Sequence, residues 1–147
     1  MFVVDTNVLI YAANDRSPFH GKSRQLLEGW RAGSLAWFLT WGICYEFLRV
    51  CTHPSVLGPP WTAQKAWEFL DSLFASASLT VLTPTDRHAA VLAQIISESP
   101  HLSGNVLYDT QTAVLMREHG VRRIYTRDTD FHRFLFLEPM DPIVQKV

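Results

Sequence analysis

Five of the fourteen acidic residues directly follow a predicted strand or lie near the start of the next predicted helix. One of them, Asp5, ends a run that is typical of a buried strand, where a lone carboxylate is costly to bury. Asp5 directly follows the apolar run "FVV", which predicts a buried strand, and Asp128 and Asp130 follow "RIYT", which belongs to the fourth predicted strand. Glu46 lies one or two turns into a helical segment after the run "LAWFLT", and Asp109 lies in the first turn of another predicted helix. Carboxylates that act together are typical of sites for Mg²⁺ or Mn²⁺, which bind oxygen ligands.

The alternation of apolar runs and helical segments predicts an α/β domain with a parallel sheet. Short, continuous apolar runs predict strands within residues 1–4, 35–40, 79–84, 122–131 and 135–139. Helical spacing and end signals predict helices within residues 6–14, 16–33, 41–53, 62–76, 85–99 and 106–120. Ligands of such sheets bind outside the carboxyl ends of the strands. Because each of the five acids follows a strand or lies near the start of the next helix, we expect them to share one crevice.

Each acid also has an ordinary structural interpretation. Asp5 is placed to cap the helix that follows it, and Asp109 is placed to stabilise a helix N-terminus. Glu46 can pair with Arg49 or Arg16 on the surface, and the two acids after "RIYT" are common turn formers. These explanations would all have to hold at four places that the predicted fold brings together, so we favour a shared site.

Composition sets the broad class. The 147 residues, 48% of them hydrophobic, predict a single domain over residues 1–147 with its own core. A net charge of −1 does not indicate a strongly basic nucleic-acid binder, although a local patch or a bound cation can replace net charge. The six histidines lack the spacing of zinc ligands, and no glycine loop for phosphates or serine nucleophile elbow is present.

The cysteines and the apolar segments indicate the compartment. Cys44 and Cys51 lie seven residues apart in one predicted helix, about 10 Å apart by helical rise, which is too far for a disulfide. Reduced cysteines suit a reducing compartment. No secretory leader or uncharged membrane-spanning run is visible, so a soluble, cytoplasmic protein with no membrane partner is expected.

The segments that carry the acids resemble PIN-domain ribonucleases, and within them the VapC-type toxins of bacterial toxin–antitoxin pairs. The resemblance rests on "VVDTNVLIYA", on Glu46, and on "YDTQTAVL" and "YTRDTDF", and it covers the whole chain in order and spacing. It implies a three-layer α/β/α fold in which helices flank a short parallel sheet. It also implies hydrolysis of RNA phosphodiester bonds with Mg²⁺ or Mn²⁺ as cofactor.

Carried over residue by residue, the resemblance makes Asp5, Glu46 and Asp109 the first three acids of the catalytic pocket. The fourth is Asp128 or Asp130; we favour Asp128 as a catalytic residue and keep Asp130 just behind the metal site. The predicted metal ligands are then Asp5, Asp109 and Asp128.

Two hydroxyls and three basic residues complete the predicted site. Thr6 and Thr126 match small polar positions beside the pocket, where a hydroxyl can orient a carboxylate or a water molecule. Arg16, Arg49 and Arg127 are the predicted contacts to RNA phosphates. The resemblance further implies a cognate antitoxin protein and a homodimer.

Helix caps and tryptophans give further expectations. Thr6 is a predicted N-cap of the first helix, and Thr85 or Asp86 caps the fifth. Trp30, Trp37 and Trp41 are predicted in the core. Trp61 and Trp67 are assigned to the core, a dimer face or a platform for stacking bases, in that order.

Three other functions can be weighed against the nuclease on the positions of the acidic residues. A phosphohydrolase with an aspartyl nucleophile needs a second acid two residues after the first, where this chain has Asn7. A receiver domain needs its aspartate after the third strand, where only Asp86 stands. A catalytically degenerate PIN-like domain that binds RNA or a partner without cleavage is the main alternative, and the complete acid set argues against it.

Overall fold

A computed structural model describes residues 1–144, and the last three residues of the predicted domain, 145–147, lie outside the described residues. Its centre is a parallel sheet with the strand order β3-β2-β1-β4-β5. The strands are β1 (Phe2–Val4), β2 (Trp37–Thr40), β3 (Leu79–Leu82), β4 (Arg123–Tyr125) and β5 (Glu138–Met140). The predicted α/β class and parallel sheet are therefore confirmed.

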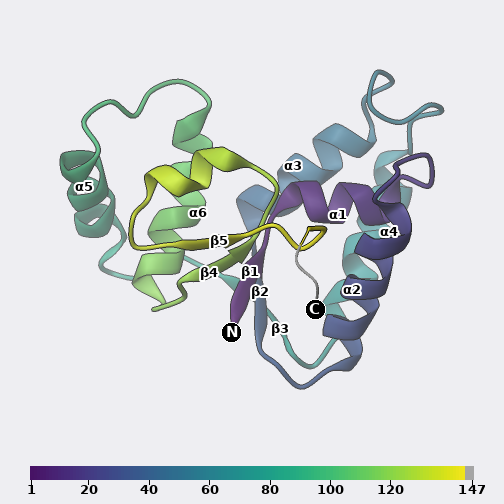
Figure 1. The fold of residues 1–147 in the computed structure, drawn as a ribbon, viewed down its shortest axis with the longest axis horizontal. Coiled ribbons are helices and arrows are strands. Elements are labelled where there is room, and N and C mark those ends of the chain that lie inside the picture. Colours follow the sequence, from purple (N-terminus) through teal and green to yellow (C-terminus); the bar gives the residue numbers. More distant parts are fainter. Residues whose placement is uncertain (145–147) are drawn as a thin grey trace.

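Helices cover both faces of this sheet. Within residues 1–144 they are α1 (Thr6–Ala13), α2 (His20–Ala32), α3 (Trp41–Cys51), α4 (Ala63–Phe74), α5 (His88–Glu98), α6 (Val106–Glu118) and the 3-10 helix η1 (Thr129–Arg133). Figure 1 shows α5 and α6 on one side of the sheet and α1 and α2 on the other. This three-layer arrangement confirms the predicted α/β/α fold. In these described residues, no helix is long and apolar enough to cross a membrane.

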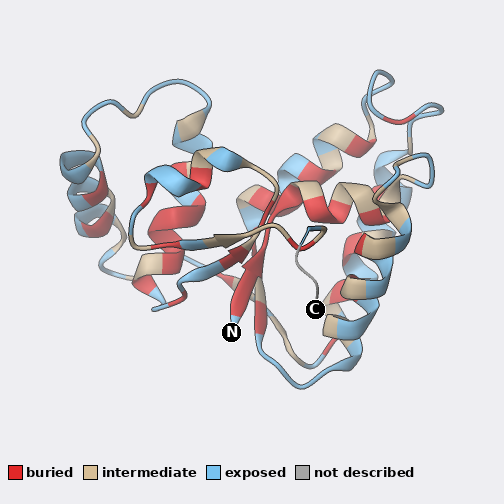
Figure 2. Ribbon diagram, in the orientation of Figure 1, coloured by how far each residue is buried: buried red, intermediate tan, exposed pale blue. Residues whose placement is uncertain are grey.

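The core explains why the apolar runs form strands. All three residues of β1 are buried, because strands on both edges and helices on both faces surround it (Figure 2). Val8 and Leu9 of α1 and Phe47 of α3 are fully buried against it. Cys44 and Cys51 are buried and free, which confirms the prediction of reduced core cysteines.

The structure decides the starts of two helices. The sequence offered both Asp5 and Thr6 as caps of the first helix, and the N-cap of α1 is Asp5, whose side chain accepts a hydrogen bond from the Thr6 backbone N–H. The fifth helix begins at His88, with Arg87 and not Thr85 or Asp86 at its N-cap. Thr85 is instead engaged by Glu118, a contact between distant parts of the chain that local sequence cannot reveal.

Candidate functional site

The five acids predicted from the sequence line one pocket. It has a volume of about 870 Å³ and lies outside the carboxyl ends of β1, β2 and β4. The acids reach it from the end of β1, from α3, from the first turn of α6, and from the loop and η1 that follow β4: Asp5, Glu46, Asp109, Asp128 and Asp130. The parallel sheet thus brings together residues up to 125 positions apart, from 5 to 130 in the numbering.

Asp5 is buried and held by three donors. Its Oδ1 accepts from the backbone N–H of Thr6 at 2.8 Å, and its Oδ2 accepts from Asn7 Nδ2 at 2.9 Å and from Thr126 Oγ1 at 2.7 Å. Burial raises the pKa of Asp5 to about 6, although the hydrogen bonds from Thr126 and Thr6 act in the opposite direction. The negative charges of Glu46 and Asp128 add to the increase.

Glu46 lies on the wall of the pocket that α3 provides. Its Oε2 accepts a hydrogen bond from the hydroxyl of Thr6 at 2.8 Å, so Thr6 orients the Glu46 carboxylate. Its Oε1 lies 3.9 Å from a guanidinium nitrogen of Arg49, one turn along the same helix. Both side chains remain half or more exposed, so this ion pair is weak and Glu46 stays accessible.

The remaining three pocket acids form a close group of carboxylates. One carboxylate oxygen from each of Asp109, Asp128 and Asp130 lies within 4.8 Å of the others. Burial, followed by the negative charges of Asp5, Asp128, Glu46 and Asp130, raises the pKa of Asp109 to about 7.

The loop after β4 sets the positions of Asp128 and Asp130. Asp128 caps η1 by accepting from the Asp130 backbone N–H at 2.8 Å, and its own N–H donates to Thr126 Oγ1 at 2.9 Å. Asp130 also pairs with Arg133 at 3.0 Å. Both acids therefore line the same pocket, and each contributes one oxygen to the group of three.

The donor set fits a hard divalent cation. Mg²⁺ and Mn²⁺ bind carboxylate oxygens together with water, and the grouped acids supply such oxygens at one open pocket. The raised pKa values of Asp5 and Asp109 express carboxylate burial and mutual repulsion, which a bound cation would offset.

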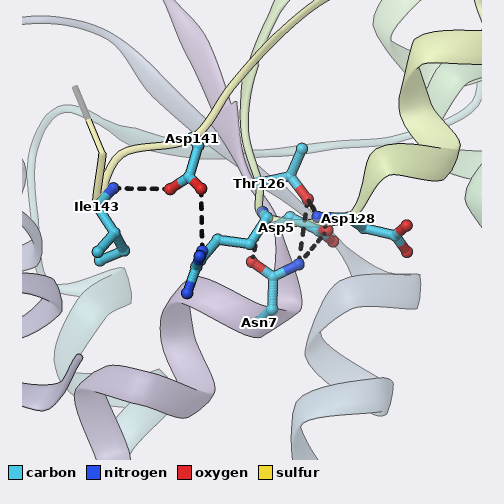
Figure 3. A network of polar contacts seen from close by, with 7 residues as sticks. Asp5, Asn7, Thr126, Asp128, Asp141 and Ile143 are labelled. Carbon is cyan, nitrogen blue, oxygen red and sulfur yellow. Dashed lines mark hydrogen bonds and ion pairs between the residues drawn. The ribbon is translucent and has the colours of Figure 1, made fainter. Parts of the chain in front are cut away.

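A network of hydrogen bonds that the sequence analysis did not predict holds the loop after β4 (Figure 3). The amide of Asn7 donates to Asp5 and to Thr126 Oγ1, and its Oδ1 accepts from the backbone N–H of Arg127 at 3.1 Å. The Arg127 side chain pairs with Asp141 at 3.0 Å. The "DTN" triplet placed Asn7 near the site, but no sequence signal pointed to Asp141.

The three basic residues predicted to contact RNA are placed differently from one another. Arg49 lines the acid pocket. Arg127 is partly buried in its ion pair with Asp141, with its guanidinium 4.2 Å from the ring centroid of Phe19. Arg16 lines a separate, smaller pocket beside Gly58. Of the three, Arg49 is the one that the structure brings to the acids.

Aromatic side chains at the pocket were also missed. Trp41 lines the pocket and is exposed, which corrects its predicted place in the core. It is the first residue of α3, where the helix has just left the sheet and its side chain is no longer covered. Tyr45 and Tyr108 line the same pocket and are more exposed still.

Comparisons with known proteins place these features in a family. The family model described as "PIN domain" matches residues 2–137. Ribonuclease VapC48 of Mycobacterium tuberculosis is 30% identical over 138 residues, which cover 94% of each chain.

Solved structures share the fold. VapC20 of Mycobacterium tuberculosis, described as a Sarcin-Ricin loop cleaving toxin, aligns with a TM-score of 0.64 and 17% identity over 94% of this chain and 98% of its own. VapBC2 from Rickettsia felis, bound to a DNA fragment from its promoter, aligns with a TM-score of 0.65 and 13% identity over 95% of this chain and 96% of the matched chain.

Proposed function

The chain belongs to the PIN-domain family, and on that basis we propose that it is a metal-dependent endoribonuclease that hydrolyses RNA phosphodiester bonds as the toxin of a toxin–antitoxin pair. The observation that carries this proposal is the convergence of five acids from four parts of the chain on one open pocket. The relatives named as VapC ribonucleases support the substrate class.

The metal would be held by Asp109 and Asp128, with Asp5 as the third predicted ligand and Asp130 close enough to contribute. When bound, Mg²⁺ or Mn²⁺ polarises a phosphoryl oxygen, lowers the pKa of a coordinated water and offsets the repulsion between the acids and an anionic substrate. Four acids are proposed as catalytic: Asp5, Glu46, Asp109 and Asp128.

The protein's own groups orient these acids. Thr126 and Asn7 hold Oδ2 of Asp5 from the side of the β4 loop, and Thr6 holds Oε2 of Glu46. Glu46 and Asp128 complete the acidic ring, where either carboxylate could position the attacking water or accept its proton. Arg49 lies at the pocket wall where it can contact a phosphate next to the one that is cut.

The proposed partners follow from the family. They are an RNA substrate of the cytoplasm, a cognate antitoxin that blocks the site, and a second copy of the chain. The alternative is a degenerate PIN-like domain that binds RNA or a partner without cleavage. The full set of pocket acids favours the enzyme.

Incubation of purified protein with total cellular RNA tests the proposal. We expect discrete fragments with Mg²⁺ or Mn²⁺, none with chelator, and none with the Asp5→Asn variant. Asp71→Asn, which removes an exposed acid of α4 away from the pocket, is the matched control and should cleave as the wild type does. Absence of cleavage by folded, inhibitor-free wild-type protein in the presence of metal would contradict the enzyme and favour the degenerate domain.

A further inference from the structure

A row of exposed side chains leads out of the acid pocket along α3. Trp41, Tyr45 and Arg49 follow one another at intervals of four residues, so they lie on one face of the helix. All three line the acid pocket. Trp41 is 45% exposed, Tyr45 is 70% exposed, and the Arg49 side chain is 70% exposed. We call these three residues the α3 stripe.

A third exposed ring stands on α6, across the pocket from the stripe. Tyr108 directly precedes Asp109, lines the same pocket and is 77% exposed. The two walls approach closely at Gly42, where an added Cβ would lie 2.9 Å from Oε1 of Gln111 on α6. The pocket is therefore lined by the acids together with exposed aromatic rings from both α3 and α6.

We propose that the α3 stripe and Tyr108 bind the RNA on either side of the phosphate that is cut, with the rings stacking on unpaired bases and Arg49 contacting the backbone; this rests on the proposed function. Aromatic faces bind bases by stacking, whatever the sequence, and a nearby cation binds the backbone between them. In this pocket Trp41 and Tyr45 supply the rings on α3, and Arg49 supplies the cation.

The position of the rings favours RNA over a protein as the occupant. Protein interfaces are also rich in Trp, Tyr and Arg, so composition alone does not decide. These rings, however, share one pocket with the acids. A phosphodiester held at the acids would carry a nucleoside on each side, next to the walls that bear these rings. Bases within a duplex are covered by their neighbours and cannot stack on these rings, so a duplex of the same sequence is a negative control for stacking.

A measurement of RNA binding in the absence of cleavage tests the α3 stripe and Tyr108 separately from catalysis. In chelator, fluorescence anisotropy measures the affinity for a labelled single-stranded RNA and for a duplex of the same sequence. Trp41→Ala and Tyr108→Ala should each weaken binding of the single strand about 5- to 150-fold, the range measured for loss of one base–aromatic stack. Trp41→Phe and Tyr108→Phe retain a ring and should restore most of the affinity.

Trp67→Ala is the matched control. Trp67 is 38% exposed and packs on Phe74 with ring centroids 5.9 Å apart, as Trp41 does, but it lies outside the pocket lining. It should leave the affinity unchanged. An equal loss of affinity in Trp41→Ala and Trp67→Ala, or equal affinity of the wild type for single strand and duplex, would overturn the proposal. Tyr108 lies almost free of packing, so its variant tests the idea even if Trp41→Ala fails to fold.

Cleavage separates this proposal from the proposed function. With metal, abasic nucleotides on both sides of the cut position should slow wild-type cleavage of a single strand. If the wild type cuts the abasic substrates as fast as the intact RNA, the proposed stacking of bases is wrong, whereas the proposed nuclease activity is supported. If variants of the stripe change the oligomeric state but bind RNA as Trp67→Ala does, the surface belongs to a protein partner and the proposal fails.

Discussion

Three hydrogen-bond donors hold the Asp5 carboxylate, yet its pKa still rises to about 6. Burial therefore outweighs the donors at this residue. Glu118 shows the opposite balance. Burial raises its pKa, but hydrogen bonds from Thr85 and His88 outweigh this and hold the pKa below its usual value. Burial has the largest effect on the pKa of Asp5, and the negative charges of Glu46 and Asp128 add to it, whereas at Glu118 the charge of His88 adds to the hydrogen bonds that lower the pKa.

Asp109 should make the metal-free protein less stable as the pH rises. A carboxyl group whose pKa is raised by folding binds its proton more tightly in the folded chain, so the free energy of unfolding falls between its unfolded pKa, near 4, and its folded pKa of about 7. In chelator, Asp109→Asn should flatten this fall and raise the melting temperature at about pH 8 by roughly 2–4 °C.

Thermal unfolding followed by circular dichroism across that pH range measures the effect. Asp71→Asn, on the exposed surface of α4, should keep the wild-type slope. A slope that is the same in Asp109→Asn and in the wild type would mean that repulsion in the pocket contributes nothing to stability.

At the scale of elements, α6 connects the pocket to a contact at its far end. Its first turn supplies Asp109, and its last residue, Glu118, accepts from the backbone N–H of Thr85 at 2.9 Å and from the Thr85 hydroxyl. The Nδ1 atom of His88 lies 2.6 Å from the other Glu118 oxygen. These bonds tie α6 to the start of α5.

Loss of the Glu118 carboxylate should destabilise the fold. Glu118→Ala leaves the Thr85 N–H and the His88 ring without their partner, which should cost about 1–3 kcal/mol in urea unfolding. Because folding lowers the pKa of Glu118, its contribution is present above the unfolded pKa and lost as the pH falls through the folded pKa. The difference between variant and wild type should therefore shrink in acid.

Glu98→Ala is the control for this prediction. Glu98 pairs with Arg117 on the surface at 3.0 Å, and loss of such a pair costs about 0–1 kcal/mol. Equal losses for the two variants would argue that Glu118 acts as an ordinary surface ion pair.

At the scale of the whole molecule, the last part of the described chain contacts the loop that follows β4 and carries Asp128 and Asp130. β5 pairs with β4, the backbone N–H of Thr126 donates to Met140, and Asp141 pairs with Arg127 beside the pocket loop. The loop after β4 is thus held from both the first and the last parts of the described chain (Figures 1 and 3). Ligands that bind only the assembled pocket should stabilise the entire fold.

Metal binding is therefore expected to raise the stability of the folded protein. Mg²⁺ or Mn²⁺ at 100 times its dissociation constant should add about 2.7 kcal/mol, which is roughly 5–11 °C in melting temperature. Asp5→Asn should reduce this gain, and Asp71→Asn should not. A metal-dependent shift that is unchanged in Asp5→Asn would count against Asp5 as a ligand.

The sequence by itself determined the fold class and the set of acids. Apolar runs and helical periodicity depend on neighbouring residues, so the strands and helices were predictable. The rule that ligands bind at the carboxyl ends of parallel strands then predicts that Asp5, Glu46 and Asp109 share one site.

Only the tertiary structure decided what depends on contacts between distant residues. Thr85 donates a hydrogen bond to Glu118 and does not cap its own helix. The Arg127 side chain forms an ion pair with Asp141, and Trp41 lines the pocket and does not lie in the core. The local sequence shows whether a side chain is apolar or charged. The residue that this side chain contacts, however, depends on how segments far apart in the chain pack together. For that reason the pocket acids could be predicted from the sequence, whereas the aromatic walls around them could not.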